Sequence, residues 1–458
     1  MPTPITIIQL ISGETLQNVM PILALRPSRV ISVFSEETKA FLKRKDAIEN
    51  AVMVHFHRPA ANPDFSLRIN LSSTSPSILE TQNAVEEVIK STPGSHIINY
   101  TGGTKEMSIG AWLAAKENGI PSIYCDSPRE FRSGGTGEIK LPVQLPELAR
   151  DLDVPTILAA QGLMFERDWQ HLGTTRPQIE FGKAAFSFTV EHPHEARILR
   201  EVIRKHGLGV NDKPRQTDLE RSINEPLPFE ENEHNRPFLL AAKSAGLLNP
   251  DHGQWFLAVS RRQQQPLKQK LSRLKNIVML LDGGAFEGYV HSCIERSTRF
   301  TGFLHGVVPK GVTERAGFGE TDFLAYEPER TSLALITCKS SPPSLEHLES
   351  VLARKEKLGG RFARGILCIM SAGSRNPDDI RRQASLLGLE CIFGNEIEGA
   401  FGCPPFEKPE FESFREFDKP PEKMNSVSSY PSNDKIDMEQ AVNSVLKDKL
   451  EQLPSRDL

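Results

Sequence analysis

The first 150 residues alternate short runs of β-branched and other apolar residues with longer stretches in which apolar residues recur every three or four positions. This alternation is typical of β-α-β units and predicts an α/β domain with a parallel sheet. The expected strands are Ile5–Ile11, Arg29–Phe34, Ala51–His57, His96–Tyr100 and Ser122–Cys125. The expected helices are Pro76–Lys90 and Lys105–Asn118, and Gly119 stands where the second should end.

The next stretch of chain has a different pattern. Between two polar-apolar stretches, the segment Arg132-Ser-Gly-Gly-Thr-Gly137 predicts a hairpin turn added to the first sheet. Residues 151–275 are less regular and predict a small mixed connector, compatible with a winged-helix-like fold. Its expected elements are helices over Glu195–His206, Gln216–Ile223 and Arg236–Ala245 and a strand over Gln254–Val259.

Residues 276–403 predict a second α/β domain. Its expected helices are Phe286–Arg296, Ser344–Lys357 and Pro377–Leu387, and its expected strands are Phe303–Pro309, Thr321–Tyr326, Ser332–Cys338 and Gly365–Met370, with a turn at Pro328. Residues 404–458 are rich in Pro, Glu, Lys and Ser as far as Asp434, a composition that buries too little apolar area to order itself. We expect a disordered tail in which only Met438–Leu450 could form a helix.

The composition is that of a globular protein with several domains. Of its 458 residues, 38% are hydrophobic, and no apolar run approaches the roughly 18 residues that a membrane span needs. The formal net charge of −4 comes from the twelve acidic and eight basic residues of 404–458, so residues 1–403 are balanced. The six cysteines form no Cys-x-x-Cys grouping, which argues against a structural zinc site. With no secretory leader pattern, we expect reduced thiols and a cytoplasmic location.

One segment, residues 261–275, is locally basic and contains no acidic residue. It fits either the solvated face of a helix or a segment that contacts phosphates, and its position just before the second α/β domain slightly favours phosphate contact. Its basic residues are Arg261, Arg262, Lys268, Lys270, Arg273 and Lys275.

A glycine pair joins a predicted strand to a predicted helix in the sequence Asn99-Tyr-Thr-Gly-Gly-Thr-Lys105. Backbone N–H groups, the positive end of the helix dipole, two hydroxyls and one ammonium would converge there, at the carboxyl edge where open sheets bind ligands. The spacing is not that of a Walker A loop, and the simpler alternative is a tight turn. The Ser12-Gly-Glu-Thr15 turn and Ser35 follow neighbouring strands and should share this edge.

Through the Asn99–Lys105 turn, residues 1–150 resemble a CRISPR-associated Rossmann-fold (CARF) sensor domain, whose family binds cyclic oligoadenylates. The resemblance implies a Rossmann-like fold and a homodimer with the ligand, cyclic tetra-adenylate, across the two-fold axis, which suits an isologous interface. It places Thr101, Gly102, Gly103, Thr104 and Lys105 around the ligand's phosphates and ribose, with Ser12, Gly13 and Thr15 opposite.

Three charged residues of the second α/β domain should lie close together. Glu287 is on its first helix, Asp322 begins a strand, and Lys339 ends the strand that pairs with it. Two carboxylates and an ammonium at one point favour a bound divalent cation, Mg²⁺ or Mn²⁺. Glu287 and Asp322 would be its ligands, and Lys339 would orient water or offset charge in phosphodiester hydrolysis. The alternative is that all three are ordinary surface charges.

The order of elements over residues 277–395, with Glu320-Thr-Asp322 and Ile336-Thr-Cys-Lys339 on paired strands, resembles the PD-(D/E)xK restriction-endonuclease-like core. Many members of that family carry an acidic residue two positions before the lysine, where this chain has Thr337. Glu320, Glu287 or the Cys338 carbonyl could complete the coordination, or the site is weakened or inactive. A CARF domain followed by such a core resembles the ancillary nucleases of type III CRISPR systems.

Histidines and one cysteine give further candidates. His55 and His57 could share a strand face and bind a metal ion, but no third ligand is visible nearby. His192 and His194 flank Pro193 in a segment that looks like the start of a helix. His291, one turn after Glu287, is expected to support the site or pack beside it. Cys338 should point away from Lys339 into the core, which argues against a nucleophile.

Taken together, the sequence predicts a metal-dependent endonuclease that is activated by cyclic oligoadenylate and cleaves DNA or RNA in antiviral defence. Two other classes stay open. One is a nucleic-acid-binding sensor with an inactive nuclease fold, and the other is a ring nuclease that degrades the cyclic messenger in the CARF pocket. All three share the same ligand.

Overall fold

The computed structural model of the chain describes residues 4–11, 13–35, 39–56, 63–72, 75–127, 130–133, 139, 145–167, 175–209, 214–259, 265–311, 320–359, 363–372 and 375–404. All of these belong to one unit, Met1–Pro404. The expected disordered tail and its Met438–Leu450 helix lie outside the described residues.

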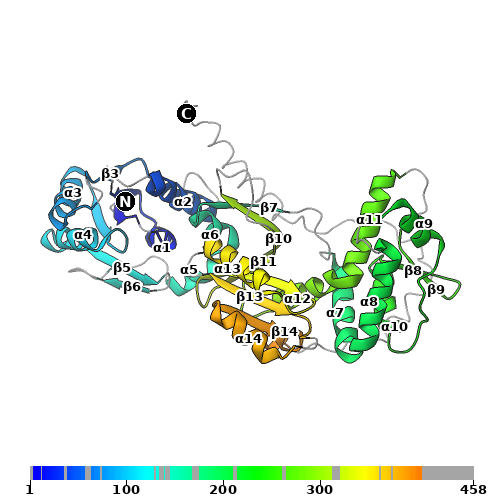
Figure 1. Ribbon diagram of the computed structural model, residues 1–458. Coiled ribbons are helices and arrows are strands. Elements are labelled where there is room, and N and C mark those ends of the chain that lie inside the picture. The colour runs from blue at the N-terminus through cyan, green and yellow to red at the C-terminus, as the bar shows by residue number, and fades with distance from the viewer. Residues whose placement is uncertain are drawn as a thin grey trace, which may run out of the picture. The chain divides into compact units, whose positions relative to one another are not determined.

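The N-terminal sheet is a Rossmann-like parallel sheet (Figure 1). Its strand order is β3-β2-β1-β4-β5-β6, and only β5 and β6 are antiparallel. The chain reverses its direction of progress between β1 and β4, which is where sheets of this type bind ligands. The strands are β1 (Ile5–Leu10), β2 (Arg29–Phe34), β3 (Arg68–Asn70), β4 (Ser95–Asn99), β5 (Ser122–Ser127) and β6 (Glu130–Ser133).

Helices cover both faces of this sheet. α3 (Ile78–Ser91) and α4 (Lys105–Glu117) lie side by side and pack on the face that carries Ile8, Ile31 and Ile98. α1 (Leu16–Leu25) and α2 (Lys39–Phe56) contact each other on the other side, as Figure 1 shows. The apolar layers on both faces give the sheet a two-sided core.

One expected strand is wrong, and one expected turn lies mostly outside the described residues. Ala51–His57 is not a strand, because its residues as far as Phe56 complete helix α2. Ala47, Ile48, Ala51 and Val52 are buried, and this i, i+1, i+4, i+5 spacing is helical. β5 and β6 are antiparallel, and Arg132 and Ser133 of the expected turn belong to β6. The rest of that turn, residues 134–137, lies outside the described residues.

The middle of the chain is mainly helical. The three helices and the strand expected here are confirmed as α8 (Pro193–Leu208), α9 (Gln216–Asn224), α10 (Arg236–Ser244) and β9 (Gln254–Leu257), which pairs with β8 (Leu248–Asp251). Three helices followed by a hairpin are the order that a winged-helix-like connector would show. Around them lie α5 (Leu145–Asp151), α6 (Val154–Ala160), β7 (Leu163–Arg167), α7 (Arg176–Glu191) and α11 (Leu267–Met279).

The second sheet is mixed, with strand order β14-β13-β12-β11-β10-β7. β7, from the span expected as a connector, pairs with β10 at its edge. β7, β10, β11 and β12 are antiparallel neighbours, whereas β12, β13 and β14 are parallel. Its elements are β10 (Gly302–Gly311), β11 (Thr321–Glu327), β12 (Ser332–Lys339), β13 (Arg364–Ile369), β14 (Leu389–Phe393), α12 (Ala285–Glu295), α13 (Leu345–Gly359), α14 (Pro377–Leu386) and α15 (Ile397–Ala400).

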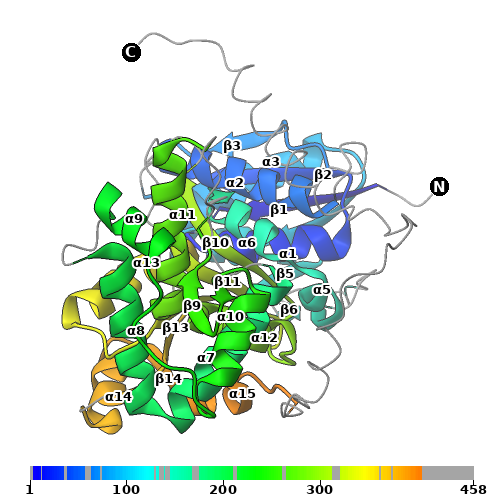
Figure 2. The ribbon, with the colours of Figure 1, turned by 90° about the vertical axis from the view of Figure 1, so that its right-hand side faces the viewer.

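Two glycines allow α7 and α12 to approach each other closely. The helices pack side by side, as Figure 2 shows. A Cβ on Gly182 would lie 2.5 Å from the Ala285 carbonyl oxygen and 2.7 Å from the Tyr289 nitrogen, and Gly288 faces Gly182. Because α12 carries Glu287, this contact fixes the position of the helix backbone at that residue.

Candidate functional site

The carboxyl ends of β1 and β4 form one continuous edge. The Gly103 N–H donates to the carbonyl of Ile11, 3.1 Å away, which ties the glycine turn to the residue after β1. Gly103 has φ +76°, a left-handed conformation that favours glycine. Thr104 begins helix α4, and its hydroxyl accepts from the Met107 N–H at 3.3 Å. Gly103, Thr104 and Lys105 are exposed and so present the helix N-terminus and one ammonium to solvent.

Thr101 and Gly102, which also belong to the predicted ligand set, stabilise the glycine turn. The Thr101 hydroxyl donates to Asn99 Oδ1 at 2.6 Å and accepts from the Cys125 N–H at 2.7 Å, which braces the turn between β4 and β5. Gly102 is buried, and its carbonyl accepts from the Ser108 hydroxyl at 2.9 Å. These two residues therefore stabilise the turn.

The turn after β1 does not present all of the side chains that were expected to face the ligand. Thr15 is buried, and its hydroxyl donates to the carbonyl of Ala160, so the side chain is not presented to a ligand. Gly13 is exposed, and Ser12 lies outside the described residues. Ser35, after β2, is buried.

Arg44 is a residue of this edge that the sequence did not point to. Its guanidinium carbon and nitrogens lie 3.7–3.9 Å from where a Cβ on Gly13 would be. Arg44 is on α2, the helix whose second half reads as a strand, so its place beside the β1 turn had no sequence signal. Together with Lys105 it gives the edge a second positive charge, which suits a phosphate ligand.

The second candidate site is set by the register of β11 against β12. Phe323 pairs with Ile336, so Asp322 stands opposite Thr337, and Lys339 follows two residues later on the same face. Asp322 Oδ2 accepts from the Cys338 N–H at 2.6 Å. Burial raises the pKa of the Asp322 carboxyl, whereas the Cys338 N–H and the positive charge of Lys339 act to lower that pKa.

Glu287 lies on α12, which packs on the face of the sheet opposite to the one that carries Asp322, Thr337 and Lys339. This helix covers the face of the sheet that carries Phe323, since His291 contacts the Phe323 ring. Burial raises the pKa of the Cys338 thiol well above its usual value, with further increases from Cys368, Asp322 and Glu287, while Lys339 lowers it. The three predicted catalytic charges therefore all act on one buried thiol, but the sheet separates Glu287 from the face that carries Asp322 and Lys339. Cys338 is buried, as expected for a residue without a nucleophilic role.

Thr337 stands opposite Asp322 and two residues before Lys339. Its side chain is only 2% exposed, and its hydroxyl has no hydrogen-bond partner among the described residues. A buried hydroxyl beside a carboxylate is an oxygen donor that a hard cation or its water could satisfy. The donors on this face, from Asp322 and Thr337, are oxygen atoms, which are the ligands that Mg²⁺ and Mn²⁺ prefer.

Arg354 and Glu320 border this site without having been predicted as catalytic. Arg354, on α13, donates to the carbonyl of Glu320, and the charges of both residues act on the pKa of Asp322. His291 is buried and packs against Phe303 and Phe323, with its Nδ1 3.1 Å from Nδ1 of His305. Its observed role is packing beside the site.

The remaining candidates fall in three places. His55 is on helix α2 rather than on a strand, and His57 lies outside the described residues. His192 does precede helix α8, but its ring also meets Glu195 and His234. Of the basic segment, Arg261 and Arg262 lie outside the described residues, and Lys268, Arg273 and Lys275 are exposed on α11. No two of the six cysteines, all of them described, form a disulfide.

Comparison with known proteins agrees with this geometry in the first domain. Residues 6–130 match the family model of the Card1 CARF domain. This match confirms the resemblance of the chain to CARF-containing proteins of CRISPR systems. No curated protein matches the sequence. Among the described residues, no helix is both long and apolar enough to span a bilayer.

Two solved structures share the fold over most of the chain. Can2 from Sulfobacillus thermosulfidooxidans, in complex with cyclic tetra-adenylate, has a TM-score of 0.59 and 17% sequence identity, and the match covers 85% of this chain and 95% of Can2. Protein VC1899 from Vibrio cholerae has a TM-score of 0.60 and 14% identity, with 87% of this chain and 96% of VC1899 covered. The shared fold includes both the Rossmann-like sheet and the second mixed sheet.

Proposed function

We propose that the chain is a metal-dependent endonuclease that is activated by cyclic oligoadenylate and acts in the cytoplasm in type III CRISPR defence. The observation that carries the proposal is the register of β11 and β12, which aligns Asp322, Thr337 and Lys339 on one face. The nuclease part rests on this register. The sensing part rests on the CARF match of residues 6–130.

Cyclic tetra-adenylate is the activator that we propose. Can2, which shares the fold, binds it. In this chain, Lys105, Arg44 and the first turn of α4 would face its phosphates, while the Gly103 conformation lets the backbone approach the ring. A four-fold ring ligand suits a homodimer that places two such edges around one axis. Ile78 and Leu79 of α3 and Ile109 of α4 are exposed apolar side chains that could form the dimer contact.

Hydrolysis would take place at the ends of β11 and β12. Asp322 would hold Mg²⁺ or Mn²⁺, with the Thr337 hydroxyl as a further oxygen donor. Glu287 would be a second ligand if its side chain passes the strand end to the face of Asp322. The ion supplies positive charge for the phosphoryl oxygens and makes water more acidic. Lys339 would hold a non-bridging phosphate oxygen and offset the negative charge that develops on it. Asp322 is kept in place by the Cys338 N–H, so its orientation does not depend on the substrate.

Activation requires the ligand to prefer the arrangement in which the hydrolytic residues are aligned. A ligand that binds both arrangements equally shifts nothing, however tightly it binds. The proposal therefore includes a difference in cyclic tetra-adenylate affinity between active and inactive states.

A second function is favoured by Thr337. Because this residue is not acidic, the second sheet could serve as an inactive scaffold, and the connector with its exposed lysines on α11 would then read nucleic acid. A ring nuclease acting in the CARF pocket is the third class.

One set of incubations separates these functions. Wild-type protein, Asp322→Asn and Lys339→Ala are incubated with Mn²⁺ and with single-stranded and supercoiled substrates, with and without cyclic tetra-adenylate. We expect ligand-dependent cutting by the wild type and loss of cutting in both variants. Asp151→Asn, an exposed carboxylate on α5, is the matched control and should cut normally. Absence of cutting with any metal would overturn the nuclease and favour the sensor.

The ligand edge is tested by calorimetry with cyclic tetra-adenylate. Lys105→Ala and Arg44→Ala should weaken binding, whereas Lys90→Ala, 70% exposed on α3, should not. Gly103→Ala should weaken binding as well, because a Cβ there would lie 3.0 Å from the Met107 Cβ and the φ is positive. Gly119→Ala shares the positive φ but has open space around it, so its affinity should equal that of the wild type. If the messenger is degraded by Asp322→Asn but not by Lys105→Ala, the ring nuclease is favoured.

A further inference from the structure

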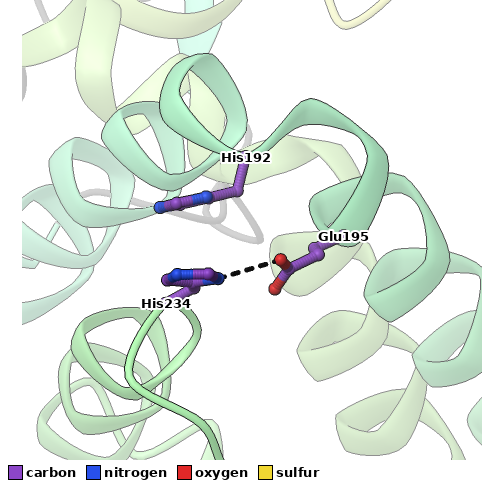
Figure 3. Close-up of side chains that lie close together, drawn as sticks. All are labelled: His192, Glu195 and His234. Carbon is purple, nitrogen blue, oxygen red and sulfur yellow. Dashed lines mark hydrogen bonds and ion pairs between the residues drawn. The ribbon is translucent and has the colours of Figure 1, made fainter.

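Two imidazoles and a carboxylate meet in the helical connector, far in sequence from both proposed sites. His192, Glu195 and His234 each offer one ligand atom, and these three atoms lie within 4.8 Å of one another (Figure 3). The His234 Nδ1 is 3.0 Å from Glu195 Oε1, and the rings of His192 and His234 are stacked with centroids 4.2 Å apart. We propose that these side chains bind a divalent transition-metal ion of the zinc type.

The backbone holds the three residues in place. The N–H of His192 donates to the Phe188 carbonyl at the end of α7, and its carbonyl accepts from Ala196 N–H at the start of α8. Glu195 is therefore in the first turn of the same helix. His234 is fixed from the other side, because Asn232 Oδ1 accepts from the N–H of His234 at 3.0 Å. The ligands thus come from two rigid backbone segments that the ion would join.

The chemistry of the donors selects the class of ion. Imidazole nitrogen suits Zn²⁺ and related transition metals, whereas Mg²⁺ prefers oxygen and keeps several waters. Two histidines and one glutamate with an open fourth position form a known kind of zinc ligand set. The Glu195 and His234 side chains are 39% and 42% exposed, so water can complete the coordination. The all-oxygen site at Asp322 would have the opposite preference.

Binding needs only side-chain movement. Tetrahedral coordination with bonds of 2.0–2.2 Å places ligand atoms about 3.4 Å apart. Atoms that now lie within 4.8 Å can reach that spacing if the two stacked rings tilt and Glu195 turns from His234 toward the ion. The exposure of these side chains leaves them room to do so. The bound ion would link the start of α8 to the segment before α10 and so stabilise the connector.

The test uses the metal-free, full-length protein carrying Asp322→Asn, in excess Mg²⁺, which silences the proposed nuclease site. Titration with Zn²⁺ by calorimetry should show one ion bound per chain, and Co²⁺ should give visible absorption bands of low coordination number. His192→Ala and His234→Ala should lose both signals, and Glu195→Gln should weaken binding. His194→Ala is the matched control, since this exposed histidine is outside the cluster.

Several outcomes would overturn the proposal. One is unchanged Zn²⁺ binding in His192→Ala and His234→Ala. Another is absence of Zn²⁺ binding, which would leave the cluster as a hydrogen-bonded link only. X-ray absorption of the Zn²⁺-loaded protein gives a readout that does not depend on the folding of any variant, and it should show two imidazoles. Because nuclease activity is not measured, failure here says nothing against the proposed function, and failure of the nuclease assay says nothing against this site.

Discussion

Replacing Gly182 with alanine should separate helices α7 and α12 and so displace Glu287. The added Cβ would lie 2.5 Å from the Ala285 carbonyl oxygen, 2.7 Å from the Tyr289 nitrogen and 2.9 Å from the Gly288 carbonyl carbon, whereas ordinary contact begins at 3.4 Å. These neighbours are backbone atoms, which cannot rotate away. The helices must therefore move apart by up to about 1 Å, the difference between 3.4 and 2.5 Å.

The expected cost follows from this overlap. Overpacking of a well-packed contact lowers the free energy of unfolding by about 1–3 kcal/mol. At about 2–4 °C per kcal/mol for a domain of 150–250 residues, the unfolding temperature should fall by about 2–12 °C. If Glu287 has the proposed role, a displacement of about 1 Å should also reduce cleavage about 100-fold well below the unfolding temperature.

The assay compares Gly182→Ala with Gly399→Ala by scanning calorimetry and by cleavage rate. Gly399 is in helix α15 and has open space where its Cβ would be, so alanine there should leave the unfolding free energy unchanged or raise it by about 0.5–1 kcal/mol. The reasoning is refuted if Gly182→Ala unfolds at the temperature of Gly399→Ala. A lower unfolding temperature with unchanged cleavage would uphold the packing argument and remove the role of Glu287.

Three further predictions concern stability, pH and signal transfer. Glu327, whose side chain is 6% exposed, pairs with Arg299 at 2.9 Å and with Arg364 at 3.0 Å. Glu327→Ala should therefore lower the free energy of unfolding by about 3–5 kcal/mol in urea titrations. A loss no larger than that of Glu349→Ala, at an exposed position, would contradict this. Burial, and secondarily the charge of Arg221, lowers the pKa of His206 below its usual 6.5, so the unfolded chain takes up the proton first as the pH falls. The free energy of unfolding should therefore decrease as the pH drops through 6.5, and it should decrease less in His206→Asn. Equal pH slopes of the two proteins in unfolding measurements would contradict this. Thr15→Val removes the hydrogen bond to the Ala160 carbonyl, so cyclic tetra-adenylate should still bind in calorimetry but should activate cleavage less. Thr15→Ser should restore activation. Full activation of the valine variant would refute the role of this hydrogen bond in signal transfer.

The local sequence pattern was sufficient for strands that are short apolar runs bounded by turns. β11 and β12 are nearly continuous apolar runs bounded by the turn at Pro328, and their pairing brought Asp322 and Lys339 to one face as predicted. The second half of α2 was predicted wrongly because Val52 and Val54 are good strand formers, and only the longer run of buried residues from Ala47 shows the helical repeat.

Contacts between distant segments left no local signal. β7 is a five-residue strand that joins the second sheet only because β10 offers it an edge. Arg44 reaches Gly13 through the packing of α2, and His234 meets His192 through the packing of α10 against α7. In each case the sequence contains the side chain, but only the tertiary fold supplies its partner.

The structure also offers a physical route between the two proposed sites. Thr15, after β1, donates to Ala160, the last residue of α6, and α6 leads directly into β7, which pairs with β10 of the second sheet. From the other side, the Tyr326 hydroxyl of β11 donates to the Ala149 carbonyl of α5. Both hydrogen bonds are buried, and β11 is the strand that begins with Asp322. A shift of the β1 turn on ligand binding would therefore act on elements that border the strand carrying the proposed catalytic carboxylate. Such a route transmits a signal only if these elements have two arrangements that the ligand distinguishes, which is the property that Thr15→Val probes.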